Sequence, residues 1–165
     1  MNKAYLLLGS NMGNRKKYLY SAIELITKNI GEIISKSAIY STSAWGNENQ
    51  SSFLNQAIHV NTNFSAEELL EGILYIEKKL GRERKKKWEA RIIDIDMLFF
   101  NKEIIHSKQL TVPHLHLHER KFALVPLTEI AKDFIHPVLK KSVKNILKEC
   151  KDKGTVIKTN NCTIE

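Results

Sequence analysis

The chain has 165 residues, of which 42% are hydrophobic and 27% are charged, and this balance predicts one globular domain over residues 1–165. The apolar run Ala4–Leu8 is too short for the core of a signal peptide, and no later run is long enough to cross a membrane. We therefore expect a cytoplasmic protein that needs no membrane. The net charge of +8 favours anionic partners without choosing among them.

The first half of the chain predicts a strand, a helix and two more strands. The apolar segment Ala4–Leu8 is typical of a buried strand closed by a turn at Gly9-Ser10-Asn11. Asn14 is expected to cap a helix that Gly31 ends, and the helix has one apolar stripe: Leu19, Ala22, Ile23, Ile26 and Ile30. Strands are then predicted at Ile33–Thr42 and Phe53–Asn63, on either side of a polar loop.

The second half begins with the clearest helix. Ser65 and Glu68 have capping-box spacing, apolar residues follow at helical spacing, and Gly81 ends the segment. A basic loop precedes a β-branched and aromatic run that predicts a central strand, Ile92–Phe100.

We expect the remaining chain to form an irregular segment, two helices and a frayed end. The helices are predicted near Glu119–Ala131, interrupted at Pro126, and near Leu139–Cys150. The order β-α-β-β-α-β predicts an α+β, ferredoxin-like fold, in which an antiparallel sheet has helices on one face and appended C-terminal helices. Neither Cys150 nor Cys162 has metal-ligand or redox spacing, so both are expected to be reduced.

Two carboxylates share one face of the strand predicted at Ile92–Phe100. Because side chains alternate along a strand, Asp94 and Asp96 point the same way. The alternate positions are expected to face the core: Ile93, Ile95 and Met97. Two carboxylates on an apolar strand repel each other and lose hydration, and a divalent cation relieves both costs. The pair therefore indicates a magnesium site, with a face turned to solvent as the alternative.

The basic loop Arg82–Arg91 lies directly before the carboxylate pair. Arginines can hold phosphate oxygens in a bidentate fork, so the loop suits a polyphosphate, although such runs are commonly only solvated. Trp88 could stack on a flat heterocycle or cover the edge of the core.

Three histidines alternate in the segment Pro113–Arg120. His114, His116 and His118 would share a face if the segment were extended, which is compatible with zinc. The sequence shows no separate fourth ligand to complete a zinc site, so contact of one histidine with phosphate is the favoured interpretation. The chain has neither G-x-x-x-x-G-K-[ST] nor G-x-G-x-x-G, which excludes the P-loop and Rossmann classes.

These residues together resemble the family of 6-hydroxymethyl-7,8-dihydropterin pyrophosphokinases. The motif Arg82-x-Arg84-x-x-x-Trp88-x-x-Arg91-x-x-Asp94-Ile95-Asp96 is similar to the family signature. Other landmarks match in order from about Ala4 to Pro137: Leu8-Gly9-Ser10-Asn11, Tyr40-Ser41-Thr42, Phe53-Leu54-Asn55, Thr111-Val112-Pro113-His114 and Arg120-x-Phe122.

The resemblance implies transfer of diphosphate from ATP to a pterin alcohol in folate biosynthesis, giving AMP and the pterin diphosphate. It implies two magnesium ions held by Asp94 and Asp96, with Arg82 and Arg91 as further catalytic residues. The residues that it implies for ATP are Glu77, Arg82, Arg84, Arg91, Thr111, His114 and Arg120. Those that it implies for the pterin are Thr42, Ser43, Trp45, Phe53, Asn55, Trp88 and Phe122. We therefore expect a monomer with two small substrates and no nucleic-acid partner.

The chain departs from the family pattern at four places. Glu89-Ala90 replaces a usual Gly-Pro, which bears on how the basic loop closes. Leu115 stands where an aromatic residue often follows the histidine, and Gln109 where a basic residue may occur. Ser43 replaces a proline, so the pterin-side loop is expected to be less rigid.

Two other functions fit parts of the pattern. A palm-type nucleotidyltransferase also uses paired aspartates on such a sheet, but it would release diphosphate instead of AMP. An RNA-binding module would suit the element order and the positive charge, but it calls for an aromatic RNP-like strand that the sequence lacks.

Overall fold

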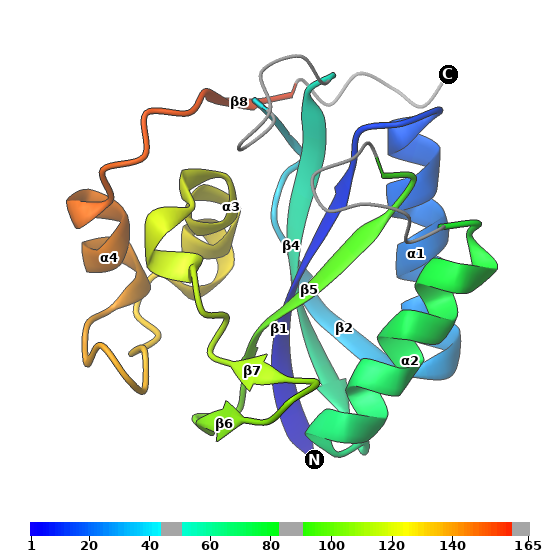
Figure 1. The fold of residues 1–165 in the computed structure, drawn as a ribbon, viewed down its shortest axis with the longest axis horizontal. Helices are drawn as coiled ribbons and strands as arrows, with labels where there is room; N and C mark the ends of the chain where they lie inside the picture. The colour runs from blue at the N-terminus through cyan, green and yellow to red at the C-terminus, as the bar shows by residue number, and fades with distance from the viewer. Residues whose placement is uncertain (44–50, 83–90, 160–165) are drawn as a thin grey trace.

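A computed structural model describes residues 1–43, 51–82 and 91–159 of the protein (Figure 1). The N-terminal elements are β1 (Asn2–Ser10), α1 (Arg15–Asn29), β2 (Gly31–Lys36), β3 (Tyr40–Thr42), β4 (Phe53–Thr62), α2 (Ala66–Lys79) and β5 (Asp94–Phe100). The C-terminal elements are β6 (Ile105–His106), β7 (Thr111–Val112), the 3-10 turn η1 (Leu117–Glu119), α3 (Lys121–Ala131), α4 (Val143–Glu149) and β8 (Val156–Lys158).

The main sheet confirms the predicted fold class. Its strand order is β5-β1-β4-β3-β8, with β2 also paired to β4. Every pairing is antiparallel. Thus β1 lies between β4 and β5, and the crossover helices α1 and α2 return along one face of the sheet, as in a ferredoxin-like core (Figure 1).

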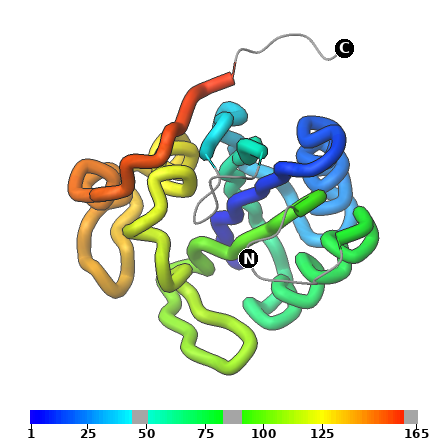
Figure 2. The backbone as a smooth tube through the Cα atoms, turned by 45° about the horizontal axis from the view of Figure 1, so that its top comes forward, coloured from blue at the N-terminus to red at the C-terminus, as the bar shows by residue number. Residues whose placement is uncertain are grey.

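Each face of the sheet has its own apolar core, and Figures 1 and 2 show helices on both sides. Leu6 and Leu8 of β1 face the core formed with α1 and α2, whereas Leu7 faces a second core formed with α3 and α4. This is the strand alternation applied to three consecutive leucines. The appended helices therefore complete a second layer over the remaining face.

The predicted ends of α1 and α2 are confirmed, although Gly31 has another role than the expected helix stop. Asn14 accepts a hydrogen bond from the Lys17 N–H at 3.1 Å, and Ser65 and Glu68 form both bonds of the capping box. Gly81 adopts a φ of +96°, as a glycine after a helix often does. Gly31 instead begins β2, where a Cβ would lie 2.0 Å from the Asn61 carbonyl oxygen. Close approach of two strands, and not helix termination, requires glycine there.

The prediction of a single strand over Ile33–Thr42 is wrong, because the structure has two strands there, β2 and β3. The Ser37 N–H donates to the Ala57 carbonyl at 2.9 Å, and the Ser37 hydroxyl accepts from the Ala57 N–H at 3.0 Å. A side chain thus replaces a backbone partner, and the chain leaves the sheet until Tyr40. The first strand is longer than predicted, because Gly9 and Ser10 also pair with β4.

The C-terminal third differs most from the prediction. Helix α3 continues through Pro126, because burial of its apolar face offsets the backbone hydrogen bond that proline cannot donate. Helix α4 begins only at Val143, since Lys140 before it has a φ of +59°. The segment predicted as irregular contains the β6–β7 hairpin, and the end predicted as frayed contains β8, paired with β3.

Within the described part of the chain, no helix is both long and apolar enough to span a bilayer. Cys150 is a free thiol, and Cys162 lies outside the described residues.

Candidate active site

The candidate site lies where β1 reaches its polar end. Gly9 pairs with Asn55 of β4 on one side and with Asp94 of β5 on the other. Residues directly opposite each other in antiparallel strands project from the same face, so the amide and the carboxylate are neighbours across Gly9. A Cβ on Gly9 would lie 2.6 Å from Asn55 Oδ1. Glycine therefore keeps the space between them open.

Asp94 is held by two arginines. Its Oδ1 accepts from Arg82 Nη1 at 2.8 Å, and its Oδ2 accepts from Arg91 Nη1 at 2.6 Å. Arg82 also pairs with Glu77, whose carboxylate accepts from the Ile95 N–H at 3.0 Å. Burial works against the Arg82 charge, but Asp94 and Glu77 outweigh it, so the pKa of Arg82 is raised. Glu77 thus joins the end of α2, Arg82 and the backbone of β5.

Asp96 differs from Asp94 in its electrostatic environment. Burial, and next the charge of Asp94, raise the pKa of Asp96 to about 7, although Arg120 and Arg91 act in the opposite direction. Ile95 and Met97 point into the core on the other face, as predicted. The pair therefore offers hard oxygen donors that gain from an added positive charge, which fits magnesium.

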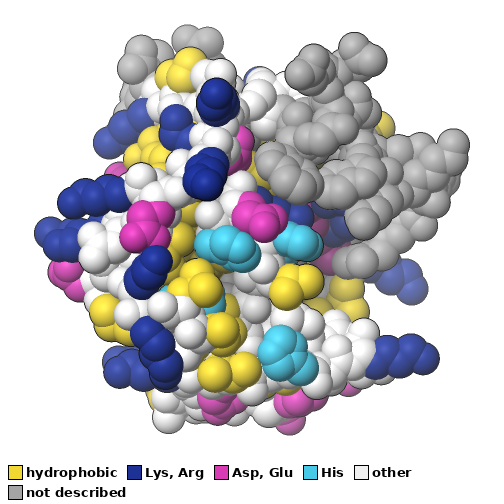
Figure 3. Space-filling model, turned by 60° about the vertical axis from the view of Figure 1, so that its left-hand side comes forward, with side chains coloured by type: hydrophobic (Ala, Val, Ile, Leu, Met, Phe, Trp, Pro, Cys, Tyr) yellow, Lys and Arg dark blue, Asp and Glu magenta, His cyan; other side chains and the backbone are white. Residues whose placement is uncertain are grey.

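The side chains of the histidine segment are not grouped as metal ligands in the structure. Within residues 1–43, 51–82 and 91–159, no group of three or more histidine, cysteine or acidic side chains could hold a metal. Instead, His116 and His118 lie 3.1 and 3.4 Å from the carboxylate of Glu119. Figure 3 shows histidines beside acidic side chains on this face.

His114 has a different environment from the two exposed histidines. Its Nδ1 accepts from the His116 N–H at 3.3 Å, which places the ring proton on Nε2. Burial, followed by the charge of Arg120, lowers the pKa of His114 to about 4, so the ring is neutral at pH 7. Thr111 lies just before it, in β7.

On the other side of Gly9, Asn55 and Thr42 form a neutral pair of side chains. Asn55 and Thr42 are 4% and 2% exposed, and Asn55 Nδ2 donates to Thr42 Oγ1 at 2.7 Å. Phe53 pairs with Thr42 across the two strands. Phe122 comes from α3, and the guanidinium carbon of Arg120 lies 5.7 Å from the centre of its ring.

Ser43 extends this side of the site to the C-terminal segment. Its N–H donates to the Thr155 carbonyl at 3.1 Å, and its hydroxyl accepts from the Thr155 N–H at 3.2 Å. The structure thus places Asn55 and Asp94 on either side of Gly9, each with the contacts described above. Three of the predicted residues lie outside the described part of the chain: Trp45, Arg84 and Trp88.

Asn11 is a site residue whose contacts the sequence did not predict. Its Oδ1 accepts from the Arg91 N–H at 2.7 Å, and its Nδ2 donates to the Ser51 carbonyl at 3.3 Å. This one buried amide therefore contacts Arg91, on the Asp94 side of Gly9, and Ser51, just before β4 on the Asn55 side. Its place in the motif Leu8-Gly9-Ser10-Asn11 is the signal that the sequence offers, but the pattern there predicts a turn.

The model of one protein family, 7,8-dihydro-6-hydroxymethylpterin-pyrophosphokinase, matches residues 5–132. The chain belongs to this family. Two curated relatives are called 2-amino-4-hydroxy-6-hydroxymethyldihydropteridine pyrophosphokinase. The one from Aquifex aeolicus is 42% identical over 90% of this chain and 92% of its own length. The one from Bacillus subtilis is 44% identical over 79% of each chain.

Solved structures of pyrophosphokinase family members share the fold. A Plasmodium falciparum HPPK-DHPS structure has a TM-score of 0.70 at 21% identity, over 90% of this chain. The chain spans only 43% of that protein. At this identity the likeness supports the fold alone.

Proposed function

We propose that this chain transfers the diphosphate group of ATP to the hydroxymethyl group of 6-hydroxymethyl-7,8-dihydropterin, as a step of folate biosynthesis. The products would be AMP and the pterin diphosphate. The observation that carries the proposal is the placement of a carboxylate pair and a buried amide on either side of Gly9, in a chain of this family.

In this reaction the substrate hydroxyl oxygen attacks the β-phosphorus of ATP. A new oxygen–phosphorus bond forms as the bond from that phosphorus to the oxygen shared with the α-phosphate breaks. AMP leaves with the electron pair, and the hydroxyl proton passes to solvent. Such transfers depend on positioning and charge stabilisation more than on covalent help from the protein.

ATP would bind on the Asp94 side of Gly9, with two magnesium ions on Asp94 and Asp96. When bound, magnesium neutralises phosphate charge and lowers the pKa of the attacking hydroxyl. Arg82 and Arg91 pair with Asp94 in the free protein. If another positive charge balanced the Asp94 carboxylate, both guanidinium groups could turn to phosphate oxygens. The neutral His114 would donate from Nε2. The other residues proposed for ATP are Glu77, Arg84, Thr111 and Arg120.

The pterin would bind on the Asn55 side of Gly9. Because Asn55 Nδ2 is committed to Thr42, its Oδ1 is oriented to accept a hydrogen bond from the polar edge of the ring. Phe122 and Trp88 would stack on the two ring faces. Backbone and side chains of the neighbouring strands would complete the pocket: Thr42, Ser43, Trp45 and Phe53. We propose that the chain acts as one domain and as a monomer, without nucleic acid or membrane.

The test is to incubate the protein with ATP, magnesium and the reduced pterin alcohol, and to identify the nucleotide product. We expect one AMP for each pterin diphosphate formed. Release of diphosphate would instead indicate a nucleotidyltransferase, and absence of pterin-dependent AMP would overturn the proposal. A filter-binding assay with RNA at physiological salt tests the remaining alternative.

A further inference from the structure

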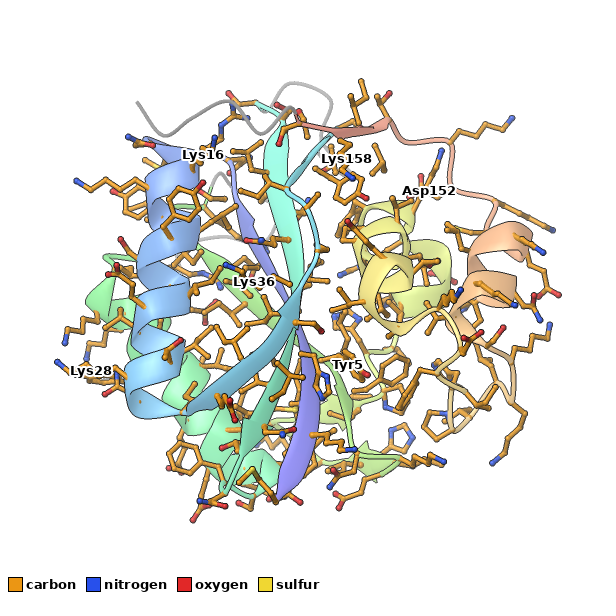
Figure 4. The ribbon with its side chains drawn as sticks, turned by 180° about the vertical axis from the view of Figure 1, so that it is seen from behind. Tyr5, Lys16, Lys28, Lys36, Asp152 and Lys158 are labelled. Atoms are coloured by element: carbon orange, nitrogen blue, oxygen red, sulfur yellow. The ribbon has the colours of Figure 1, made fainter. Side chains whose placement is uncertain are left out.

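Glu129 of α3 contacts β3 and the edge strand β8, and both are distant from it in sequence. Its Oε2 accepts from the Ala38 N–H at 3.0 Å and from the Tyr40 hydroxyl at 2.9 Å. Its Oε1 faces Lys158 Nζ of β8 at 3.8 Å. Figure 4 shows Lys158 at the end of the sheet nearest α3. One carboxylate therefore holds β3 and β8 against the helix.

The phenol of Tyr40 is well adapted to this contact. Tyr40 is 9% exposed, and its hydrogen bond to Glu129 places the ring on the face of the sheet that α3 covers. Burial, and next the hydrogen bond to Glu129, raise the pKa of Tyr40 to about 12. The phenol thus remains a hydrogen-bond donor throughout the physiological range.

The strand that Glu129 holds also carries the neutral side of the site. Tyr40 pairs directly with Asn55 across β3 and β4, and Thr42 accepts the Asn55 amide two residues further along. Ala38 lies in the break between β2 and β3, where the backbone has left the sheet and its N–H is free to bond to a helix. The position of Thr42 is thus fixed from one end by Glu129.

The proposed function also assigns Phe122 of α3 to that pocket. Phe122 and Glu129 are seven residues apart on α3, and residues at this spacing lie on one face of a helix. The distance between Phe122 and the pair Thr42–Asn55 therefore depends on how α3 sits against β3. Glu129 makes the polar contacts that fix this placement.

We propose that Glu129 is a positioning residue for the pterin subsite, which it shapes by fixing β3 and β8 against α3. The proposal rests on the proposed function, because it assigns the pterin to the Thr42–Asn55–Phe122 side. It predicts an effect on pterin affinity without an equal effect on ATP affinity or on the rate of transfer.

The test compares Glu129→Ala with the wild-type protein. We expect the dissociation constant for the pterin alcohol, measured with a non-hydrolysable ATP analogue present, to rise about tenfold, the effect of losing one or two hydrogen bonds. The ATP dissociation constant should change less than about twofold, and kcat at saturating pterin should stay within about threefold. Glu129→Gln keeps an acceptor oxygen and should recover most of the affinity.

Two controls separate positioning from general loss of stability. Glu149→Gln removes another surface carboxylate, paired with Lys141 at 2.7 Å on α4, and should leave pterin affinity unchanged. If Glu129 acts through Tyr40, then Tyr40→Phe should weaken pterin binding in the wild type but add little to Glu129→Ala. Unchanged pterin affinity in a Glu129→Ala protein with lowered Tm would overturn the proposal. Failure of the wild type to bind pterin would instead overturn the proposed function.

Discussion

The two sides of Gly9 are held in different ways. On one side, Asp94 is held by charge, through Arg82 and Arg91, with Glu77 buried behind them. On the other side, Asn55 is held by one neutral hydrogen bond to Thr42 inside a paired strand. In the proposed function, the charged side would exchange its partners for phosphate and metal, whereas the neutral side would offer a fixed pattern of donors and acceptors. A single strand thus separates the proposed ATP side, held by ion pairs, from the proposed pterin side, held by a neutral hydrogen bond.

The largest expected effect comes from removing a carboxylate of the charged side. Asp94→Ala or Asp96→Ala should reduce turnover by roughly a thousandfold or more, because loss of a metal removes several kcal/mol of charge stabilisation. Circular dichroism should show the fold intact, since both side chains lie at the polar end of the sheet. Near-normal turnover of either variant at saturating magnesium would show that the pair does not hold the metal.

Arg82→Ala should reduce kcat by about a hundredfold, as removal of a donor to developing charge often does. The ATP dissociation constant should change much less, because Arg82 is engaged by Asp94 and Glu77 in the free protein. The variant leaves the buried Glu77 without this arginine, so Glu77→Gln/Arg82→Ala serves as a control for folding. Collapse of ATP affinity with kcat preserved would make Arg82 a ground-state contact.

Asn55→Ala should act on the other substrate. Loss of one buried hydrogen-bonding partner costs about 1–3 kcal/mol, which should appear in the pterin dissociation constant. Titration calorimetry should find ATP binding nearly unchanged. Equal weakening of both ligands would show that the two sides of Gly9 are not separate subsites.

The smallest expected effect is that of salt. Raising the ionic strength from about 0.05 to 0.5 M shortens the range of charge interactions, so ATP binding should weaken by several-fold. Pterin binding should hardly change, because Asn55 and Thr42 are neutral. Parallel titrations of the two ligands provide the measurement, and equal salt dependence would contradict the contrast between the two sides.

The sequence predicted those parts of the fold that depend on local pattern. Apolar spacing, the capping box of Ser65 and Glu68, and alternation around Ile95 each act over a few residues, and all are confirmed. The break at Ser37 was not predictable, because its hydroxyl replaces a backbone partner on Ala57, which belongs to another strand. Strand β8 has only three residues, and its pairing depends on β3, more than a hundred residues earlier.

The same limit applies to the candidate site. Asp94 and Asp96 could be proposed from the sequence because a short motif contains both carboxylates and the basic loop. Asn11 could not be assigned, since its partners Ser51 and Arg91 lie 40 and 80 positions away. Glu129 carries no local sign of a role, because its hydrogen bonds reach back to Ala38 and Tyr40, 91 and 89 positions earlier.

The pairing of β8 with β3 has a consequence for engineering of this protein. Three residues near the C-terminus form the outer edge of the sheet, and the strand beside them carries Thr42. A tag, reporter or second enzyme joined directly after β8 would pull on the outer wall of the proposed pterin pocket. Such an attachment therefore needs a flexible spacer if β3 is to keep its position. A short rigid connection would displace β3 and so alter which substrates bind.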